Sequence, residues 1–153
     1  MQAICDHKRR FLDIDMAHPA STSDYLAFGT SRICEGLESN GFLCKGMSIC
    51  GDNVYSNTPH MITSVKSTSY GPEDAFNFYH SQICINIECA FGMLVKWWTV
   101  LRSFIPINIG IKKTIPMVHC LCYLHNFLIN QINVSSIPKS TAQDSLLIDC
   151  MKG

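Results

Sequence analysis

Residues 75–101 read AFNFYHSQICINIECAFGMLVKWWTVL and contain the most regular apolar pattern of the chain. Apolar side chains recur at steps of four and three residues, at Ile83, Ile87, Phe91, Leu94 and Trp98. This spacing predicts a long amphipathic helix with one buried side. Glu88 lies in the middle of this helix, where a carboxylate is costly unless it is paired, hydrated or bound to a metal ion. A solvated helix face is the alternative explanation for Glu88.

The segment ahead of this helix places a second carboxylate at the end of a strand. Residues 46–51 have the length and the flanking glycines of a short buried strand, and Asp52 follows them directly. Sites of α/β proteins are commonly built beyond the ends of strands, so Asp52 is a candidate site residue. Residues 56–74 are rich in Ser, Thr, Pro and Gly, which predicts a loop-dominated insert with one further strand at 61–65.

The remaining elements are shorter or less regular. Two short apolar segments within residues 3–14 flank a polar turn and predict a β-hairpin. Several capping side chains precede apolar residues at near-helical spacing and predict a helix over 23–38. A second long helix is expected over 114–131, with Pro116 tolerable only in its first turn. The tail, 132–153, has no clear period and is expected to be frayed.

The composition limits the class of protein. A chain of 153 residues is long enough for one domain and too short for a second, separate module. Twelve basic and twelve acidic residues give a formal charge of zero, so the composition supplies no electrostatic argument for nucleic acid. The longest weakly charged stretch, 115–129, is interrupted by polar residues and is too short to span a bilayer. We therefore expect no membrane partner.

Four blocks of the sequence, in order, resemble PIF/Harbinger-type DDE transposases, which belong to the DDE superfamily of endonucleases. Residues 11–24 are similar to that family's strand followed by P-G-S-x-x-D, and residues 51–55, GDNVY, are similar to its G-D-x-x-Y segment. Residues 76–92 are similar to its F-N-x-x-H-S and I-E-x-A-F-G segments. Residues 120–126 resemble its closing L-H-N helix. Each block alone is a weak signal, whereas four blocks in the family's order are specific.

This resemblance implies an RNase H-like α/β core, with a mixed sheet flanked by helices and acidic residues that hold divalent metal ions. Asp52 and Glu88 match the second and third members of the catalytic triad, and Asp24 matches a further acidic metal position. Mg²⁺ and Mn²⁺ prefer such oxygen ligands and keep waters that a phosphate can replace. For Asp24, a carboxylate in the first turn of a helix, favoured by the helix dipole, is the alternative role.

The resemblance also implies that the family's first triad aspartate is absent, because the D-G-T-H type motif that carries it has no match among the 23 residues before Asp24. We therefore expect residues 1–131 to form a partial domain that lacks the first central strand of the sheet. Cys84 and Asn86 stand where basic residues commonly flank the glutamate, which would weaken DNA contacts. A truncated and catalytically inactive chain is the expected result.

By the same resemblance, the partner is DNA at transposon ends, with a separate DNA-binding protein as a further partner. The nucleus is the expected location, and the cytoplasm is the alternative because no targeting signal is found. Two other functions stay open. The chain could be a non-catalytic interaction protein that uses Trp97, Trp98 and the helix at 114–131. The second alternative is a zinc-binding protein with its site at 119–125, although the C-x-C-x₂-H spacing lacks the paired cysteines of structural zinc sites.

Overall fold

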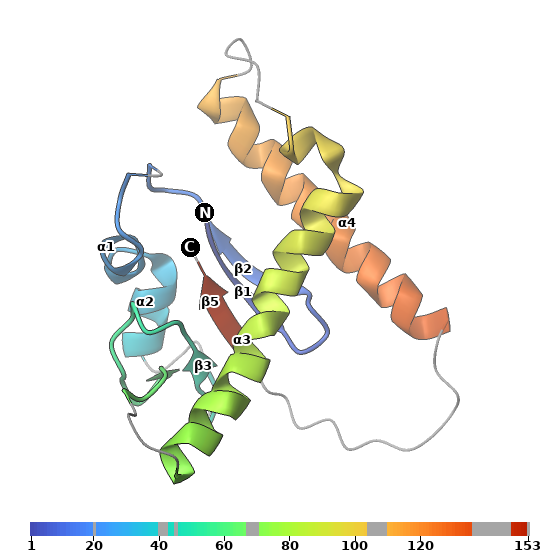
Figure 1. Ribbon diagram of the computed structural model, residues 1–153. Helices are drawn as coiled ribbons and strands as arrows, with labels where there is room; N and C mark the ends of the chain where they lie inside the picture. Colours follow the sequence, from blue (N-terminus) through green and yellow to red (C-terminus); the bar gives the residue numbers. More distant parts are fainter. Residues whose placement is uncertain are drawn as a thin grey trace.

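A computed structural model describes residues 1–19, 21–39, 43–44, 46–66, 71–103, 110–135 and 148–152. Within these residues, two small β-sheets are flanked by α-helices, as Figure 1 shows. The expected α/β class, an RNase H-like arrangement with helices beside a sheet, is confirmed. None of the described helices is long and apolar enough to cross a membrane.

The larger sheet is built on the predicted hairpin. Strand β1, Gln2–Asp6, pairs antiparallel with β2, Phe11–Asp15, so that Ala3 lies opposite Ile14. The other edge of β1 pairs antiparallel with β5, Ile148–Lys152, which makes the strand order β2-β1-β5. The sequence predicts a frayed tail over 132–153, of which residues 136–147 and 153 lie outside the described residues. Strand β5 lies within this tail, and apolar periodicity does not indicate it.

The smaller sheet carries the segment that leads to Asp52. Strand β3, Ile49–Cys50, pairs in parallel with β4, Met61–Ile62. Both strands are shorter than the segments predicted at 46–51 and 61–65. Strand β5 contacts β3 as well as β1, so the two sheets lie next to one another with β5 at their junction (Figure 1).

The single helix predicted over 23–38 is wrong, because two short helices occupy this segment. Helix α1, Asp24–Gly29, and helix α2, Arg32–Glu38, are separated by Thr30 and Ser31. The Ser31 hydroxyl donates to the Phe28 carbonyl at 2.7 Å and accepts from the Cys34 amide at 3.2 Å. Ser31 thus closes the first helix and caps the second, because its side chain competes with the backbone for hydrogen bonds.

The two long helices appear where the apolar pattern predicts them. Helix α3 spans Pro72–Trp97 and is followed by the short 3₁₀ helix η1, Thr99–Leu101. Helix α4 spans Ile111–Ser135, so it begins earlier than expected and contains Pro116 beyond its first turn. Pro116 and Lys112 are both exposed, so water can reach the Lys112 carbonyl that the missing proline N–H leaves unbonded.

The core lies on both faces of β1, because successive side chains of a strand point to opposite sides. Ala3 and Cys5 belong to a cluster that packs against α3 and α4. Ile4 belongs to a second cluster, which packs against α2, β3 and β4. The long helices therefore cover one face of the hairpin and the short helices cover the other.

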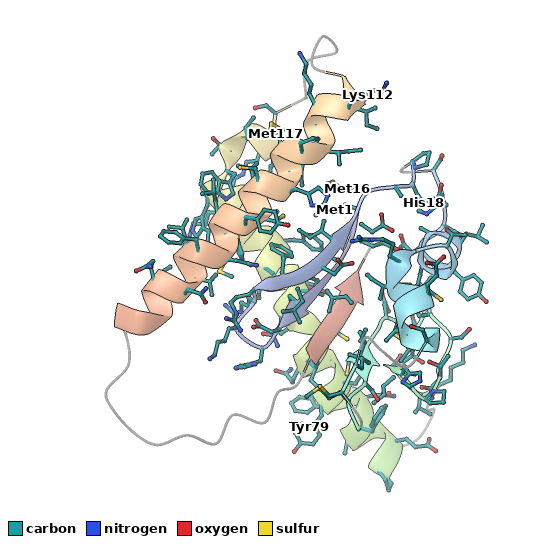
Figure 2. All side chains as sticks on the ribbon, turned by 180° about the vertical axis from the view of Figure 1, so that it is seen from behind. Met1, Met16, His18, Tyr79, Lys112 and Met117 are labelled. Atoms are coloured by element: carbon teal, nitrogen blue, oxygen red, sulfur yellow. The ribbon has the colours of Figure 1, made fainter. Side chains whose placement is uncertain are left out.

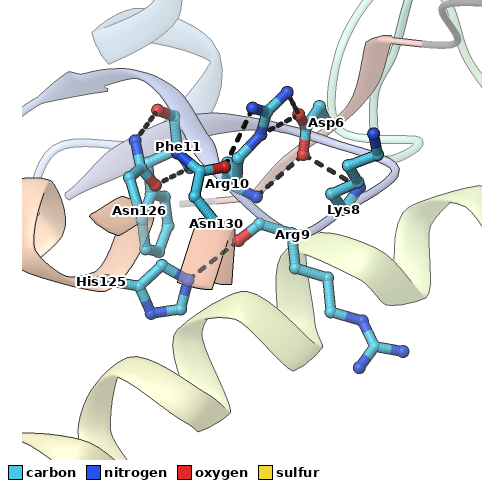
Figure 3. A network of polar contacts seen from close by, with 8 residues as sticks. All are labelled: Asp6, Lys8, Arg9, Arg10, Phe11, His125, Asn126 and Asn130. Carbon is cyan, nitrogen blue, oxygen red and sulfur yellow. Dashed lines mark hydrogen bonds and ion pairs between the residues drawn. The ribbon is translucent and has the colours of Figure 1, made fainter. Parts of the chain in front are cut away.

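Two side chains of α4 fasten this helix to the hairpin (Figure 3). The Asn126 side chain accepts from the Phe11 amide and donates to the Phe11 carbonyl, both at 2.8 Å. His125 is fully buried, and its Nε2 donates to the Arg9 carbonyl at 2.9 Å. Burial lowers the pKa of His125, so the ring is neutral at pH 7, while the bond to Arg9 opposes this shift. The closing block of the sequence thus docks α4 onto the hairpin.

Candidate metal centre

Asp52 lies at the point where β3 ends and the chain turns. The Gly51 amide donates to the Ile62 carbonyl at 2.8 Å, which continues the pairing with β4 up to the residue before Asp52. The Asp52 carbonyl then accepts from the Tyr55 amide at 3.0 Å, and its carboxylate accepts from the Asn53 amide at 2.6 Å. Asp52 is half-buried. The strand and the turn together hold its carboxylate at the sheet edge, as expected from the sequence.

Steric crowding favours glycine at the position before Asp52. A Cβ atom built on Gly51 would lie 2.6 Å from the Met61 Sδ and 3.1 Å from the Tyr55 Cδ2. Both neighbours are buried. The glycine and the tyrosine of the G-D-x-x-Y block therefore fit against one another, and the fit sets the path of the chain through Asp52.

Glu88 lies on α3, directly after the fully buried Ile87, and is itself exposed. Asp52 and Glu88 line the same open cleft, which has a volume of about 460 Å³. One wall of the cleft comes from α3, and the other comes from the end of β3 and the residues after β4, Ser64 and Val65. Two of the three predicted metal residues, which are far apart in the sequence, thus line one cleft.

Two polar residues of the F-N-x-x-H-S block join the two walls of the cleft. The Asn77 side chain accepts from the Val65 amide at 2.8 Å and donates to the Val65 carbonyl at 2.7 Å. The buried His80 donates through Nε2 to the Ile62 carbonyl at 3.2 Å. These bonds fix the chain after β4 against α3. Asn77 and His80 are therefore positioning residues, a role that sequence analysis missed although it singled out the block.

Asp24, the third predicted metal residue, lies apart from this cleft. It stands in the first turn of α1 and lines a separate pocket with Asp15 and His18. His18 lies beside α1 in Figure 2, well away from Tyr79 on the half of α3 that lines the cleft. The structure thus places Asp24 where its alternative role, a first-turn carboxylate at a helix start, also applies.

Tyr55 lies close enough to Asp24 and Asp52 to feel both charges. Burial, followed by the negative charges of Asp24 and Asp52, raises the pKa of Tyr55 to about 12. Gln2 connects the same residues, because its amide donates to the Asp24 carbonyl at 2.8 Å and to the Tyr55 hydroxyl at 3.4 Å. Asp24 and Asp52 thus both act on one buried tyrosine in the electrostatics of the site, although Asp24 does not line the cleft.

No three His, Cys, Asp or Glu side chains converge on one point within the part of the chain that the structure describes. The residues of the alternative zinc site at 119–125, for example, do not converge. Cys120 is exposed, whereas Cys122 is buried two residues later. His125 uses its Nε2 to bind the Arg9 carbonyl. By contrast, Asp52 and Glu88 offer hard oxygen atoms at an open cleft, which suits an ion such as Mg²⁺ that keeps several waters.

An α/β fold with a pair of carboxylates at a strand end and on a neighbouring helix is the kind of arrangement that metal-dependent nucleases use. A family model described as DDE superfamily endonuclease matches residues 1–126. The chain belongs to this family, whose members generally use divalent metal ions and act on DNA. No curated protein and no solved structure matches the chain significantly.

Proposed function

We propose that this chain is a divalent-metal-binding domain of the PIF/Harbinger type within the DDE endonucleases. Asp52 and Glu88 are the proposed catalytic carboxylates and metal ligands, and Mg²⁺ or Mn²⁺ is the proposed ion. The observation that carries the proposal is that these two residues line one open cleft. Asp24 is proposed as a further metal residue, in the pocket that it shares with Asp15.

Each part of the cleft has a defined task under this proposal. A bound ion would polarise a phosphoryl oxygen and help to generate the attacking hydroxide. Asp52 is held by the turn after β3, and Glu88 by the rigid helix α3, so both carboxylates are placed before an ion arrives. Asn77 and His80 keep the two walls at a constant separation. The open side leaves room for a DNA phosphate.

Metal titration tests the proposed ligands. We expect Asp52→Asn and Glu88→Gln each to weaken Mn²⁺ binding by about tenfold or more, because the number of charged oxygen ligands sets the affinity for such ions. Isothermal titration calorimetry measures this directly. Asp74→Asn and Glu73→Gln, in the first turn of α3, are matched controls that remove the same charges outside the cleft. Equal Mn²⁺ affinity in all five proteins would contradict the proposal.

We further propose that the 153-residue chain does not cleave DNA. No aspartate ahead of Asp24 matches the family's first triad position, and Cys84 and Asn86 occupy positions where a basic side chain would attract phosphate. We expect a supercoiled plasmid to stay intact when the purified chain is added with Mg²⁺. Clear Mg²⁺-stimulated nicking that Asp52→Ala abolishes would overturn this expectation.

DNA at transposon ends remains the proposed partner, and a separate DNA-binding protein is proposed to bring the domain to it. The support is the neutral net charge of the chain, which leaves little attraction of its own for phosphate. The nucleus, where such DNA is found, is the proposed location.

A non-catalytic interaction protein is the second candidate function, and one observation favours it. Helix α4 exposes large apolar side chains, including Tyr123 at 72% and Phe127 at 59%. Trp97 and Trp98 contribute less than the sequence suggests, because the Trp97 ring contacts His125 in a tilted arrangement with ring centroids 5.0 Å apart and Trp98 packs against the core. The Mn²⁺ titration separates the candidates, since this function requires no ion at Asp52 and Glu88.

A further inference from the structure

A second cavity, with a volume of about 310 Å³, lies where α2 approaches the smaller sheet (Figure 1). Its lining comes from Leu37 near the end of α2, from residues before β3 and from residues before β4. Three of the lining residues carry side chains that bind transition metals, namely Cys44, Met47 and His60. This cavity shares no described lining residue with the cleft between α3 and the end of β3.

A tight turn brings Cys44 and Met47 together. The Met47 amide donates to the Cys44 carbonyl at 3.0 Å, which is the bond that closes a four-residue β-turn. Gly46 holds the third position of the turn with φ at 86°, a left-handed conformation that glycine adopts without strain. The Cα atoms at the two ends of a β-turn lie within about 7 Å of one another. The two sulfur-containing side chains therefore start from neighbouring backbone positions.

Backbone and side-chain bonds place His60 beside this turn. The Ile49 amide donates to the His60 carbonyl at 2.8 Å, and the Ser48 hydroxyl donates to the Pro59 carbonyl at 3.3 Å. The residue directly after Met47 is thus tied to the residue directly before His60. His60 is half-buried, and its ring nitrogens have no hydrogen-bond partner among the described residues. A ring nitrogen is therefore available to an ion in the cavity.

The donor atoms of this cavity select the kind of ion. Soft thiolate and thioether ligands favour Cu(I), and imidazole is also a common copper ligand. None of the described lining residues is an aspartate or a glutamate, so hard ions such as Mg²⁺ find no carboxylate there. Leu37, Leu43 and Pro59 supply apolar walls that limit the access of water to a bound ion. Cys44 is a free, exposed thiol, so its proton can leave to solvent as a metal–sulfur bond forms.

We propose that Cys44, Met47 and His60 form a binding site for Cu(I), with one thiolate, one thioether and one imidazole ligand. The ion stays in its reduced state, and release of the Cys44 proton accompanies formation of the copper–sulfur bond. The inference does not rest on the proposed function, because its ligands are separate from Asp52 and Glu88. Binding of Cu(I) and binding of Mn²⁺ are therefore lost through different substitutions.

Competition for Cu(I) between the full chain and a chromophoric chelator, under anaerobic reducing conditions, tests this inference. We expect Cys44→Ser, Met47→Leu and His60→Gln each to weaken Cu(I) binding by about tenfold or more, because even residues that only support metal ligands contribute that much. Cys120→Ser and Met117→Leu on α4 are the matched controls, since Cys120 is also a free, exposed thiol. Both controls should keep the affinity of the unaltered chain. Equal losses in Cys44→Ser and Cys120→Ser would show nonspecific binding by thiols and overturn the inference.

X-ray absorption at the copper edge, with one equivalent of Cu(I), reads out the ligands directly. We expect two sulfur neighbours and one nitrogen neighbour in the unaltered chain, and one sulfur neighbour fewer in Met47→Leu. Leucine and methionine are close in volume, so this variant keeps the packing of the cavity. Zn²⁺ is bound through Cys, His and carboxylate ligands, so Met47→Leu should leave Zn²⁺ affinity unchanged. Unchanged Cu(I) affinity in Met47→Leu, or copper without a nitrogen neighbour, would refute the site.

Discussion

Asn126→Ala is expected to lower the free energy of unfolding by about 2–4 kcal/mol, because it leaves two backbone groups of a buried residue without partners. The Asn126 side chain receives the Phe11 amide proton and donates to the Phe11 carbonyl, at 2.8 Å each (Figure 3). Phe11 is only 5% exposed, so water replaces these bonds poorly.

Asn130→Ala is the matched control for this variant. Asn130 lies one turn further along α4, is exposed, and accepts a single bond of 3.2 Å from Arg10. Exposed hydrogen bonds compete with water, so we expect a loss of at most about 0.5 kcal/mol. Urea unfolding followed by tryptophan fluorescence measures both variants, since the Trp97 ring contacts His125, the residue before Asn126. Equal losses in the two variants would contradict the role assigned to Asn126.

Sequence patterns predict the elements whose burial is periodic. The spacing of Ile83, Ile87 and Leu94 predicts α3, and Ile87 and Leu94 are indeed buried against the hairpin. The same reasoning finds the hairpin and places Asp52 at a strand end. It fails at Ser31, where the apolar spacing continues across a break that a hydroxyl group creates through local hydrogen bonds.

Long-range pairing is the second kind of information that periodicity lacks. Five residues such as Ile148–Lys152 form a strand because β1 offers an unpaired edge, and nothing within those residues indicates it. The pair of hydrogen bonds between the Asn77 side chain and Val65 is a second contact that periodicity does not indicate. The side-chain amide of Asn77 has the shape of a backbone peptide group, so it bonds to the Val65 amide and carbonyl as a neighbouring strand would. An asparagine three residues before a motif histidine, and therefore on the same side of the predicted helix, is the signal that would have indicated it.

The sequence predicts the residues of the candidate site that lie in regular local patterns, and it does not predict how packing places the others. A strand end and a helix midpoint can be read from local pattern, so the sequence singles out Asp52 and Glu88, which line one cleft. Asp24 follows a turn whose path depends on packing, and it lies in another pocket beside Asp15. Both Asp24 and Asp52 act on the pKa of Tyr55, whose burial no local pattern reveals.

Gly51→Ala is expected to lower the free energy of unfolding by about 1–3 kcal/mol, as overpacking of a filled core usually does. The added methyl group would meet the Met61 Sδ at 2.6 Å and the Tyr55 ring at 3.1 Å. Both neighbours are buried, Met61 at 1% and Tyr55 at 4% exposure, so the overlap is relieved either by repacking these side chains or by a shift of the chain at Gly51. A shift of Gly51 would displace Asp52 with it. We expect Mn²⁺ affinity to fall together with stability.

Gly92→Ala separates this steric effect from the general effect of replacing glycine. Gly92 lies inside α3 and is exposed, and a Cβ there meets nothing within 4 Å. Alanine at such a helix position should raise the free energy of unfolding by about 0.5–1 kcal/mol, because glycine is the poorer helix former. The two substitutions should thus change stability in opposite directions, with loss of Mn²⁺ affinity only for Gly51→Ala. Full Mn²⁺ affinity in Gly51→Ala would show that the cleft tolerates a displaced Asp52, and it would remove the steric explanation for glycine ahead of this aspartate.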